Sequence, residues 1–278
     1  MLSKEELKAL GEEGFVAAPG ESEEVFVKRV DILKEVAKNP GRLLSGKIFE
    51  TWEGDVSHVL RANPKWIPLI YSNHKLPLWQ GAVLWIFGEK GKEQFPIIQM
   101  RKGFRKGKIL FYSQKEVLNH ELLHAIRMGF DEPRFEEILA YSHSSSKIRR
   151  FFGPLFRTPN QAIVFLVLIL LSIALQTTAL FFTTSPLLPW IKGLSLLPFL
   201  DLAFRSASLI RDQRILKKAL KKLSEIFPNQ QDVFPIAVRL KDAEIELFAL
   251  SSVGQILNEI EEKVPVSLRW RQILAQFC

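Results

Sequence analysis

Residues 162–182, "AIVFLVLILLSIALQTTALFF", run for 21 positions without a charged side chain. A helix of this length, at 1.5 Å per residue, spans about 30 Å, the thickness of the hydrocarbon core of a bilayer. A soluble domain as small as this one rarely buries a helix that is apolar on every side. The stretch therefore predicts a transmembrane helix, with a buried core helix as the alternative.

A second and weaker apolar segment follows at 187–204, after the short polar link "TTSP". Lys192 and Asp201 interrupt it, and Trp190 with Lys192 suits the end of a helix at a membrane interface. The positive-inside rule predicts a transmembrane hairpin at 159–210 with both soluble parts in the cytoplasm, because basic residues flank the pair and are absent from the link. These basic residues are Lys147, Arg149, Arg150 and Arg157 before the pair, and Arg205, Arg211, Arg214, Lys217 and Lys218 after it.

The net charge of +8 is distributed around this apolar pair. This pattern favours a lipid bilayer as the partner of the basic residues, and not a nucleic acid. Cys278, the last residue, is the single cysteine. An intrachain disulfide and a thiolate metal cluster are therefore both excluded.

The remaining sequence predicts a mostly helical α+β protein in four parts. Residues 1–40 are expected to form N-terminal helices and 41–158 a soluble domain, followed by the transmembrane hairpin at 159–210 and a helical C-terminal region at 211–278. Within this last region, 211–227 is cationic on one face and apolar on the other. This pattern indicates either a helix lying on an anionic membrane surface or a helix with a solvated cationic face.

A small antiparallel sheet is expected in the soluble domain. Residues 82–100, "AVLWIFGEKGKEQFPIIQM", contain two apolar runs around a Gly/Lys turn and predict a hairpin. Residues 107–113, "GKILFYS", are a candidate third strand. An unpaired strand edge at 95–100 or 108–112 could hold an extended peptide by β-augmentation.

The period of apolar residues then changes to a helical one over 114–130, which contains "HELLH" at 120–124. Residues four apart lie on one side of a helix, so His120 and His124 could both bind one zinc ion at about 2.0–2.1 Å. Glu121 is rotated by about 100° from His120, which suits a general base better than a ligand. This is the HExxH arrangement, in which ligands and base are separated by helix geometry.

A second helix is predicted from Pro133, with Glu136 and Glu137 in its early turns. HELLH followed by "E-x-x-A" resembles the gluzincin group of zinc metallopeptidases, and the resemblance covers about residues 119–143. It implies a zincin-like fold, with Glu137 as the third zinc ligand because Ala140 stands three positions after it. Glu136 remains the alternative ligand, and the separation of 12 residues between His124 and Glu137 requires a tight reversal.

Tyr141 stands where the gluzincin pattern often has an acid that orients a histidine. A different group, such as Glu136 or a backbone carbonyl, would then have to fix the histidine tautomer. For the donor to the oxyanion the candidates are His143, Tyr141, Arg127 and Tyr112, and we choose His143, although an exposed polar role for it is the simpler interpretation. Arg127 is expected to pair with a carboxylate.

These residues predict a membrane-anchored zinc metallopeptidase that hydrolyses peptide or protein substrates with a zinc-activated water and Glu121 as general base. The alternative is a non-catalytic, membrane-anchored interaction protein in which HELLH is incidental or vestigial. Substrate preference and oligomeric state are not determined by the sequence.

Overall fold

The computed structural model describes residues 1–42, 49–50, 52, 56–77, 80–88, 94–181, 184, 186, 188–229 and 231–278. It is mostly helical, as predicted. The α-helices are α1 (Lys4–Glu12), α2 (Glu23–Lys38), α3 (Ser57–Leu60), α4 (Gln114–Ile126), α5 (Pro133–Tyr141), α6 (Lys147–Phe152), α7 (Pro159–Phe181), α8 (Leu188–Leu194), α9 (Leu197–Ile226), α10 (Val233–Val238), α11 (Asp242–Leu250), α12 (Val253–Lys263) and α13 (Leu268–Phe277). Short 3-10 helices are η1 (Pro40–Arg42), η2 (Lys102–Lys106) and η3 (Gly153–Leu155).

The sheet next to α4 has three strands in the order β1 (Leu69–Tyr71), β3 (Phe95–Met100), β2 (Ala82–Phe87). β2 and β3 pair in antiparallel fashion, with Leu84 opposite Ile98, which confirms the predicted hairpin. The expected antiparallel sheet is nevertheless mixed, because β1 pairs with β3 in parallel, with Leu69 opposite Ile98. β3 is thus the buried central strand, and β2 lies at the edge of the sheet that faces α4.

The predicted third strand at 107–113 does not join this sheet. It folds back on itself as a separate two-stranded ladder of β4 (Lys108–Ile109) and β5 (Tyr112–Ser113). Leu110 adopts a φ of 50°, in the left-handed region, and this conformation allows the chain to reverse at Leu110–Phe111. Neither of the proposed edges, 95–100 or 108–112, is therefore the sheet edge beside α4.

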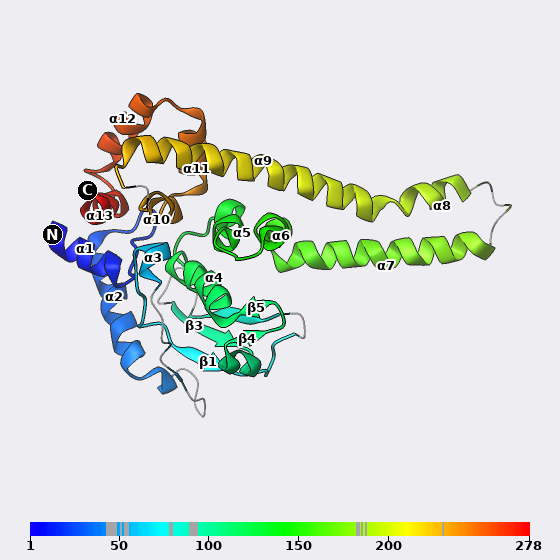
Figure 1. Cartoon of the computed structure of the whole chain (residues 1–278), viewed down its shortest axis with the longest axis horizontal. Helices are drawn as coiled ribbons and strands as arrows, with labels where there is room; N and C mark the ends of the chain where they lie inside the picture. The colour runs from blue at the N-terminus through cyan, green and yellow to red at the C-terminus, as the bar shows by residue number, and fades with distance from the viewer. Residues whose placement is uncertain are drawn as a thin grey trace.

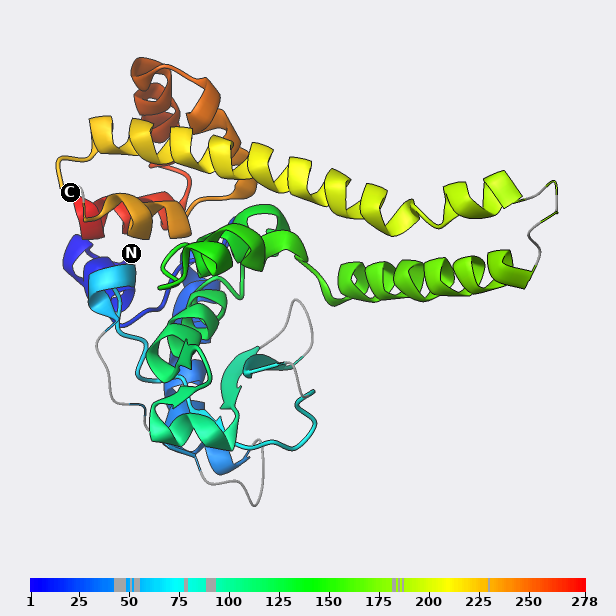
Figure 2. The same ribbon diagram turned by 45° about the vertical axis from the view of Figure 1, so that its right-hand side comes forward.

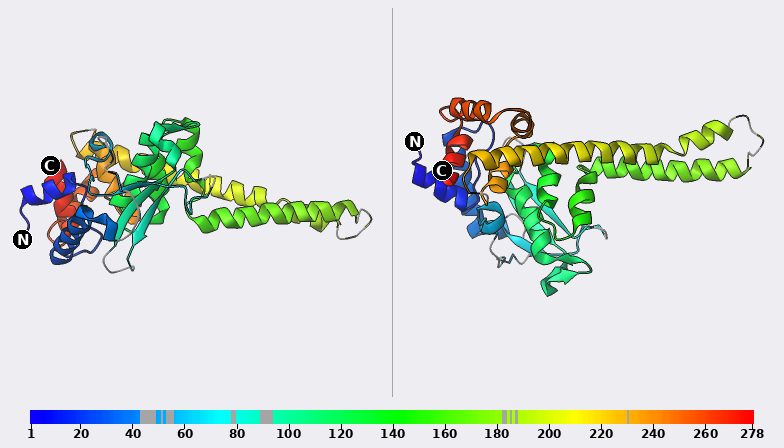
Figure 3. Two further views of the ribbon diagram at one scale, coloured as in Figure 1. Left: turned by 90° about the horizontal axis from the view of Figure 1, so that it is seen from below. Right: turned by 45° about the horizontal axis from the view of Figure 1, so that its top comes forward.

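Two apolar helical segments project together from the rest of the molecule (Figure 1), and the other views show the same pairing (Figures 2 and 3). Pro159–Phe181 and Leu188–Ile226 are both long and apolar enough to span a membrane. The hydroxyl of Ser172 on α7 donates to the carbonyl of Ser195 at 2.7 Å, between α8 and α9. Most other apolar side chains of α7 are exposed, which distinguishes α7 from the buried core helix considered as the alternative.

α9 is longer than the second apolar segment, since it continues without interruption through the cationic stretch at 211–226. This stretch is not a separate helix. Its cationic face, which includes Arg214, Lys217 and Lys218, is exposed, as expected for a solvated helix face. The opposite face packs against the soluble part of the molecule, chiefly α11, and its buried side chains are Asp212, Leu216, Ala219 and Leu223.

The hydrophobic core crosses the four parts expected from the sequence. One buried cluster extends from Val16 to Ile273 and includes residues of α4, α5, α9 and α11. α1 packs against α13. The buried amide of Gln272 joins the two ends of the chain, accepting from Ala17 N at 2.9 Å and donating to Phe15 O at 2.8 Å. The N- and C-terminal helices therefore support the domain that contains HELLH.

Candidate metal centre

The helix that carries both histidines, α4, begins at a conventional N-cap. The hydroxyl of Ser113 accepts from the backbone N–H of Glu116 at 3.1 Å. One side of the helix is buried in the core through Leu118, Leu122 and Ile126. This packing fixes the rotation of α4 and thereby the direction in which its polar side faces.

α4 and α5 are joined by a tight turn over residues 127–132, as the short separation of the motifs requires. Asp131 has a φ of 52°. A Cβ on Gly129 would lie 2.8 Å from the Cβ of Ala18, so a larger residue would force the turn away from the N-terminal segment. Pro133 occupies the first turn of α5, where its fixed φ favours the start of a helix.

The two helices bring His120, His124 and Glu137 together in an arrangement that could hold a metal ion. The Nε2 atoms of the histidines are 3.2 Å apart. Glu137 oxygens lie 3.8 Å from Nε2 of His120 and 3.5 Å from Nε2 of His124. Ligands of a tetrahedral zinc with bonds of about 2.0–2.1 Å are about 3.4 Å apart. The separations of 3.2–3.8 Å among these side chains are close to that value, so the group could hold a metal ion.

Each imidazole also has a partner outside the group of three potential ligands. Nδ1 of His124 lies 2.7 Å from Oε1 of Glu136, and the His120 ring bonds to the backbone carbonyl of Ala140. Position 141 holds a tyrosine and not the acid that often orients a histidine in the gluzincin pattern. A carboxylate, Glu136, and a backbone carbonyl, that of Ala140, contact the histidine rings instead. They direct both Nε2 atoms toward Glu137, in the way that outer groups orient histidine ligands.

Charge at the site favours a cation. Burial opposes protonation of His124, but the hydrogen bond with Glu136 and the charge of Glu137 outweigh it and raise the pKa of His124 to about 9. Burial and the neighbouring His124 lower the pKa of His120 well below its ordinary value. One positive charge, a proton or a metal ion, is thus stabilised between the histidines and the glutamates.

Glu121 lies beside the three potential ligands and is 8% exposed. Burial, aided by the charge of Glu137 and opposed by His124, raises the pKa of Glu121 to about 7. Its carboxylate also accepts a hydrogen bond from the backbone of Leu84 on β2. Glu121 is therefore placed between the histidines and the edge strand.

A cavity of about 390 Å³ opens at this point. Side chains of α4 and α5, including the five polar residues described above, form one side of it. Val83, Leu84 and Ile86 of β2 line the other. The edge of the sheet and the group of potential ligands thus face the same space.

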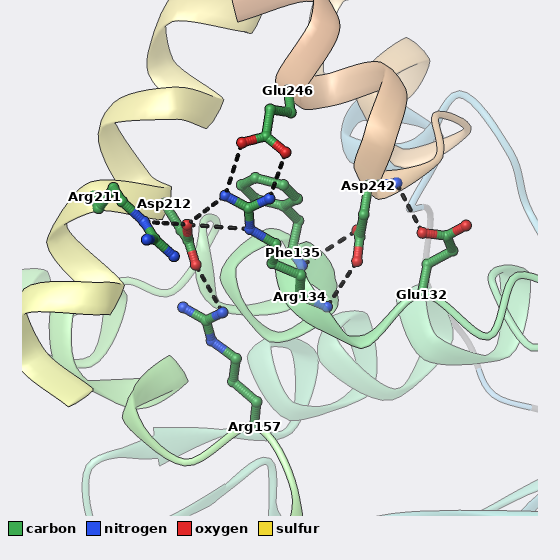
Figure 4. A network of polar contacts seen from close by, with 8 residues as sticks. All are labelled: Glu132, Arg134, Phe135, Arg157, Arg211, Asp212, Asp242 and Glu246. Carbon is green, nitrogen blue, oxygen red and sulfur yellow. Dashed lines mark hydrogen bonds and ion pairs between the residues drawn. The ribbon is translucent and has the colours of Figure 1, made fainter. Parts of the chain in front are cut away.

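Ion pairs hold α5, the helix of Glu137, against α9. Arg134 contacts Oδ1 of Asp212 at 2.9 Å and Oε2 of Glu246 at 2.7 Å (Figure 4). The second oxygen of Asp212 is 2.8 Å from Arg157, which lies two residues before α7. Asp212 is fully buried, so this carboxylate joins the glutamate helix to both helices that project from the molecule.

The N-termini of α5 and α11 also cap each other (Figure 4). The carboxylate of Asp242 accepts from the backbone N–H groups of Arg134 at 2.8 Å and Phe135 at 3.3 Å. In return, Glu132 accepts from the backbone N–H of Asp242 at 3.0 Å. The cap of α5, which its own sequence does not supply, therefore comes from a residue more than 100 positions away.

The candidate oxyanion donors are distributed differently from the ligands. Neither His143 nor Tyr141 is among the residues that line the cavity. His143 is exposed, and its ring centroid lies 4.2 Å from that of Phe234. The ring centroid of Tyr141 lies 4.6 Å from that of His120, and burial together with the charge of Glu137 raises the pKa of Tyr141 to about 12.

Arg127 donates to the backbone carbonyls of Val238 and Leu240, and not to the expected carboxylate.

Sequence reasoning did not identify Asp212 or Leu84. A signal for Asp212 is present in the sequence, because this acid lies in register with the apolar residues on one face of α9. The residues of that face, spaced by three and four, are Leu209, Asp212, Leu216, Ala219 and Leu223. The role of Leu84 depends on which strand lies at the sheet edge, and periodicity does not contain this information.

No protein-family model matches the chain, and neither a curated protein nor a solved structure matches it. The resemblance to gluzincins therefore rests on the residues of α4 and α5 alone.

Proposed function

We propose that the protein is a membrane-anchored zinc metallopeptidase whose two apolar helices cross the bilayer and whose soluble parts lie in the cytoplasm. The observation that carries this proposal is the convergence of His120, His124 and Glu137, with Glu121 adjacent to them. Two imidazoles and one carboxylate are a typical ligand set of catalytic zinc, since they leave a fourth position open. The basic residues around the helical pair support the orientation.

Zinc in this position would supply Lewis-acid chemistry, polarising a peptide carbonyl and activating water for attack. Glu121 would accept the proton of the attacking water and deliver it to the leaving amine. Burial of Glu121 next to the cavity supports this role. Tyr141 would donate its hydroxyl to the developing oxyanion, because its ring already contacts His120 and its high pKa keeps the proton on it. The sequence analysis chose His143 for this role instead, and that choice remains an untested prediction.

The substrate would lie extended beside β2. This strand is at the sheet edge, and Leu84 and Ile86 line the cavity there. A peptide that pairs with an exposed edge binds through its backbone, so that residues of many kinds are accepted and only the pockets select among them. The edge strand differs from the two considered from sequence, but it offers the same mode of binding.

The test is hydrolysis by the full chain in lipid nanodiscs, with a fluorogenic casein and a mixture of unrelated peptides analysed by mass spectrometry. Glu121→Gln is expected to keep its zinc and to lose activity by a factor of about 100 or more, because general bases contribute on that order. 1,10-Phenanthroline should abolish activity and zinc should restore it. Equal rates of hydrolysis by the wild type and by Glu121→Gln would contradict the proposal. Wild-type protein that binds zinc but hydrolyses none of the substrates would favour the non-catalytic alternative.

A further inference from the structure

Five large apolar side chains are exposed on two segments near the base of the projecting helices. Leu110 and Phe111, in the turn between β4 and β5, are 82% and 86% exposed. Ile148, Phe151 and Phe152 on α6 are 71%, 37% and 51% exposed. We call these five residues the apolar platform. A group of large apolar side chains with such exposure indicates a surface that binds a membrane or another molecule.

The two halves of the platform form one rigid unit through Arg149. Its guanidinium donates to the carbonyl of Phe111 at 3.1 Å and lies 4.4 Å above the ring of Tyr112. The same side chain forms an ion pair with Glu116 at 2.9 Å, in the first turn of α4. Hydrogen bonds from Ser144 and Ser145 to Glu116 complete the connection. The β4–β5 turn is therefore connected through Arg149 to both α6 and the first turn of α4.

The short connection between α6 and α7 places the platform next to the start of the apolar pair. α6 ends at Phe152, η3 follows at once, and α7 begins at Pro159. Figure 1 shows α6 at the base of α7, on the side of the soluble part from which the pair projects. If α7 enters a bilayer, α6 lies where the headgroups are.

The charges around the platform also match this environment. Exposed cations accompany the apolar residues, and α6 contains no acid. Aromatic and apolar side chains mixed with Lys and Arg are typical of segments that lie in the interface of an anionic membrane. The cations are Lys106, Lys108, Lys115, Lys147 and Arg150.

We propose that the apolar platform inserts into the headgroup region of a bilayer containing anionic lipid, as a second contact with the membrane besides the apolar pair. It would hold the soluble part in one orientation on the lipid surface. Glu116 is four residues before His120, about 6 Å along the axis of α4, so this contact would also fix the distance of the candidate metal centre from the membrane. The inference depends on the apolar pair spanning a bilayer and is independent of catalysis.

Site-directed spin labelling tests the proposal. In a Cys278→Ser background, single labels are introduced by Phe111→Cys and Phe152→Cys in the full chain, reconstituted in nanodiscs of phosphatidylcholine and phosphatidylglycerol. Val266→Cys is the matched control, because Val266 is apolar and 85% exposed. It lies two residues before α13, which is at the far end of the molecule from α8 (Figure 1). Power saturation then compares collisions with oxygen and with a water-soluble nickel chelate.

Labels at 111 and 152 are expected to collide more with oxygen than with the nickel chelate, and the label at 266 is expected to do the reverse. Equal access of the nickel chelate to 111 and 266 would overturn the proposal. Shielding of 111 from both reagents would also overturn it, because protein and not lipid would then cover the platform. Circular dichroism and size-exclusion profiles identify variants that fold as the parent does.

Discussion

Nδ1 of His124 lies 2.7 Å from Oε1 of Glu136, while Nε2 of the same ring points to the Nε2 of His120 at 3.2 Å. Two adjacent acids of α5 thus contact opposite edges of one imidazole, since Glu137 is on the Nε2 side at 3.5 Å. Glu136 contacts Nδ1 of His124, and Glu137 lies on the Nε2 side, where a metal ion could bind. This relationship separates the roles of two glutamates that the sequence left as alternatives.

Glu136→Gln is expected to weaken zinc affinity by about 10–100-fold, as the loss of a group that orients a histidine ligand usually does. Glu137→Gln should weaken it considerably more, because it removes a charged ligand. Competition with a chromophoric chelator at pH 7.5 measures both affinities. A larger loss in Glu136→Gln than in Glu137→Gln would reverse the assignment of the third ligand.

Asp212→Asn is expected to destabilise the fold and loosen the helix of Glu137. The substitution leaves Arg134 and Arg157 facing a buried neutral amide, and we expect a loss of about 1–3 kcal/mol in unfolding free energy, since Arg134 keeps partial access to water. Zinc affinity should fall with it. Thermal unfolding monitored by circular dichroism and chelator competition provide the two measurements.

Asp201→Asn is the control for this experiment. Asp201 is on the same helix and pairs with Arg205 at 2.6 Å, but it has no contact with α5 among the described interactions. Its replacement should leave zinc affinity unchanged. An equal effect of both substitutions on zinc affinity would contradict a specific role of Asp212.

Glu244→Gln is expected to make stability less dependent on acid pH. Burial alone would raise the pKa of Glu244, but the charge and hydrogen bond of Arg269 at 2.7 Å outweigh it and lower the pKa. A lowered pKa stabilises the folded state above the unfolded value, about 4.3, and this contribution is lost as pH falls through the folded value. Breaking so buried a pair costs about 3–5 kcal/mol near neutral pH.

Thermal midpoints between pH 7 and pH 3 measure this effect. The difference between wild type and Glu244→Gln should be largest near neutral pH and should shrink below about pH 4.3. Glu262→Gln, at an exposed position of α12, should change the midpoint little at any pH. A difference between wild type and Glu244→Gln that grows toward acid pH would contradict the lowered pKa.

The helical features of this chain were predictable because they depend on local spacing. A charge-free run of 21 residues predicts the exposed helix α7, and positions 120 and 124 share a side of any helix that contains both. The small Ala140 distinguished Glu137 from Glu136 through the gluzincin pattern. The three potential ligands do converge.

Features that depend on distant contacts were not predictable. β1 is three residues long and pairs with β3 across a separation of about 30 residues, so no periodicity revealed the mixed sheet. The cationic stretch after the apolar pair continues α9, whose buried residues include Leu216 and Ala219 and which packs chiefly against α11. Asp242 caps α5 from the C-terminal region, and this contact exists only once the two parts have docked.

Zinc content is the most direct test of the claim that His120, His124 and Glu137 form one metal site. Purified full chain, loaded with zinc and desalted, should contain one zinc per chain by inductively coupled plasma mass spectrometry. Glu121→Gln should contain the same amount, and His120→Ala and His124→Ala should contain almost none while keeping their helical spectra. Wild-type protein without zinc, or histidine variants that retain a full equivalent, would contradict the account.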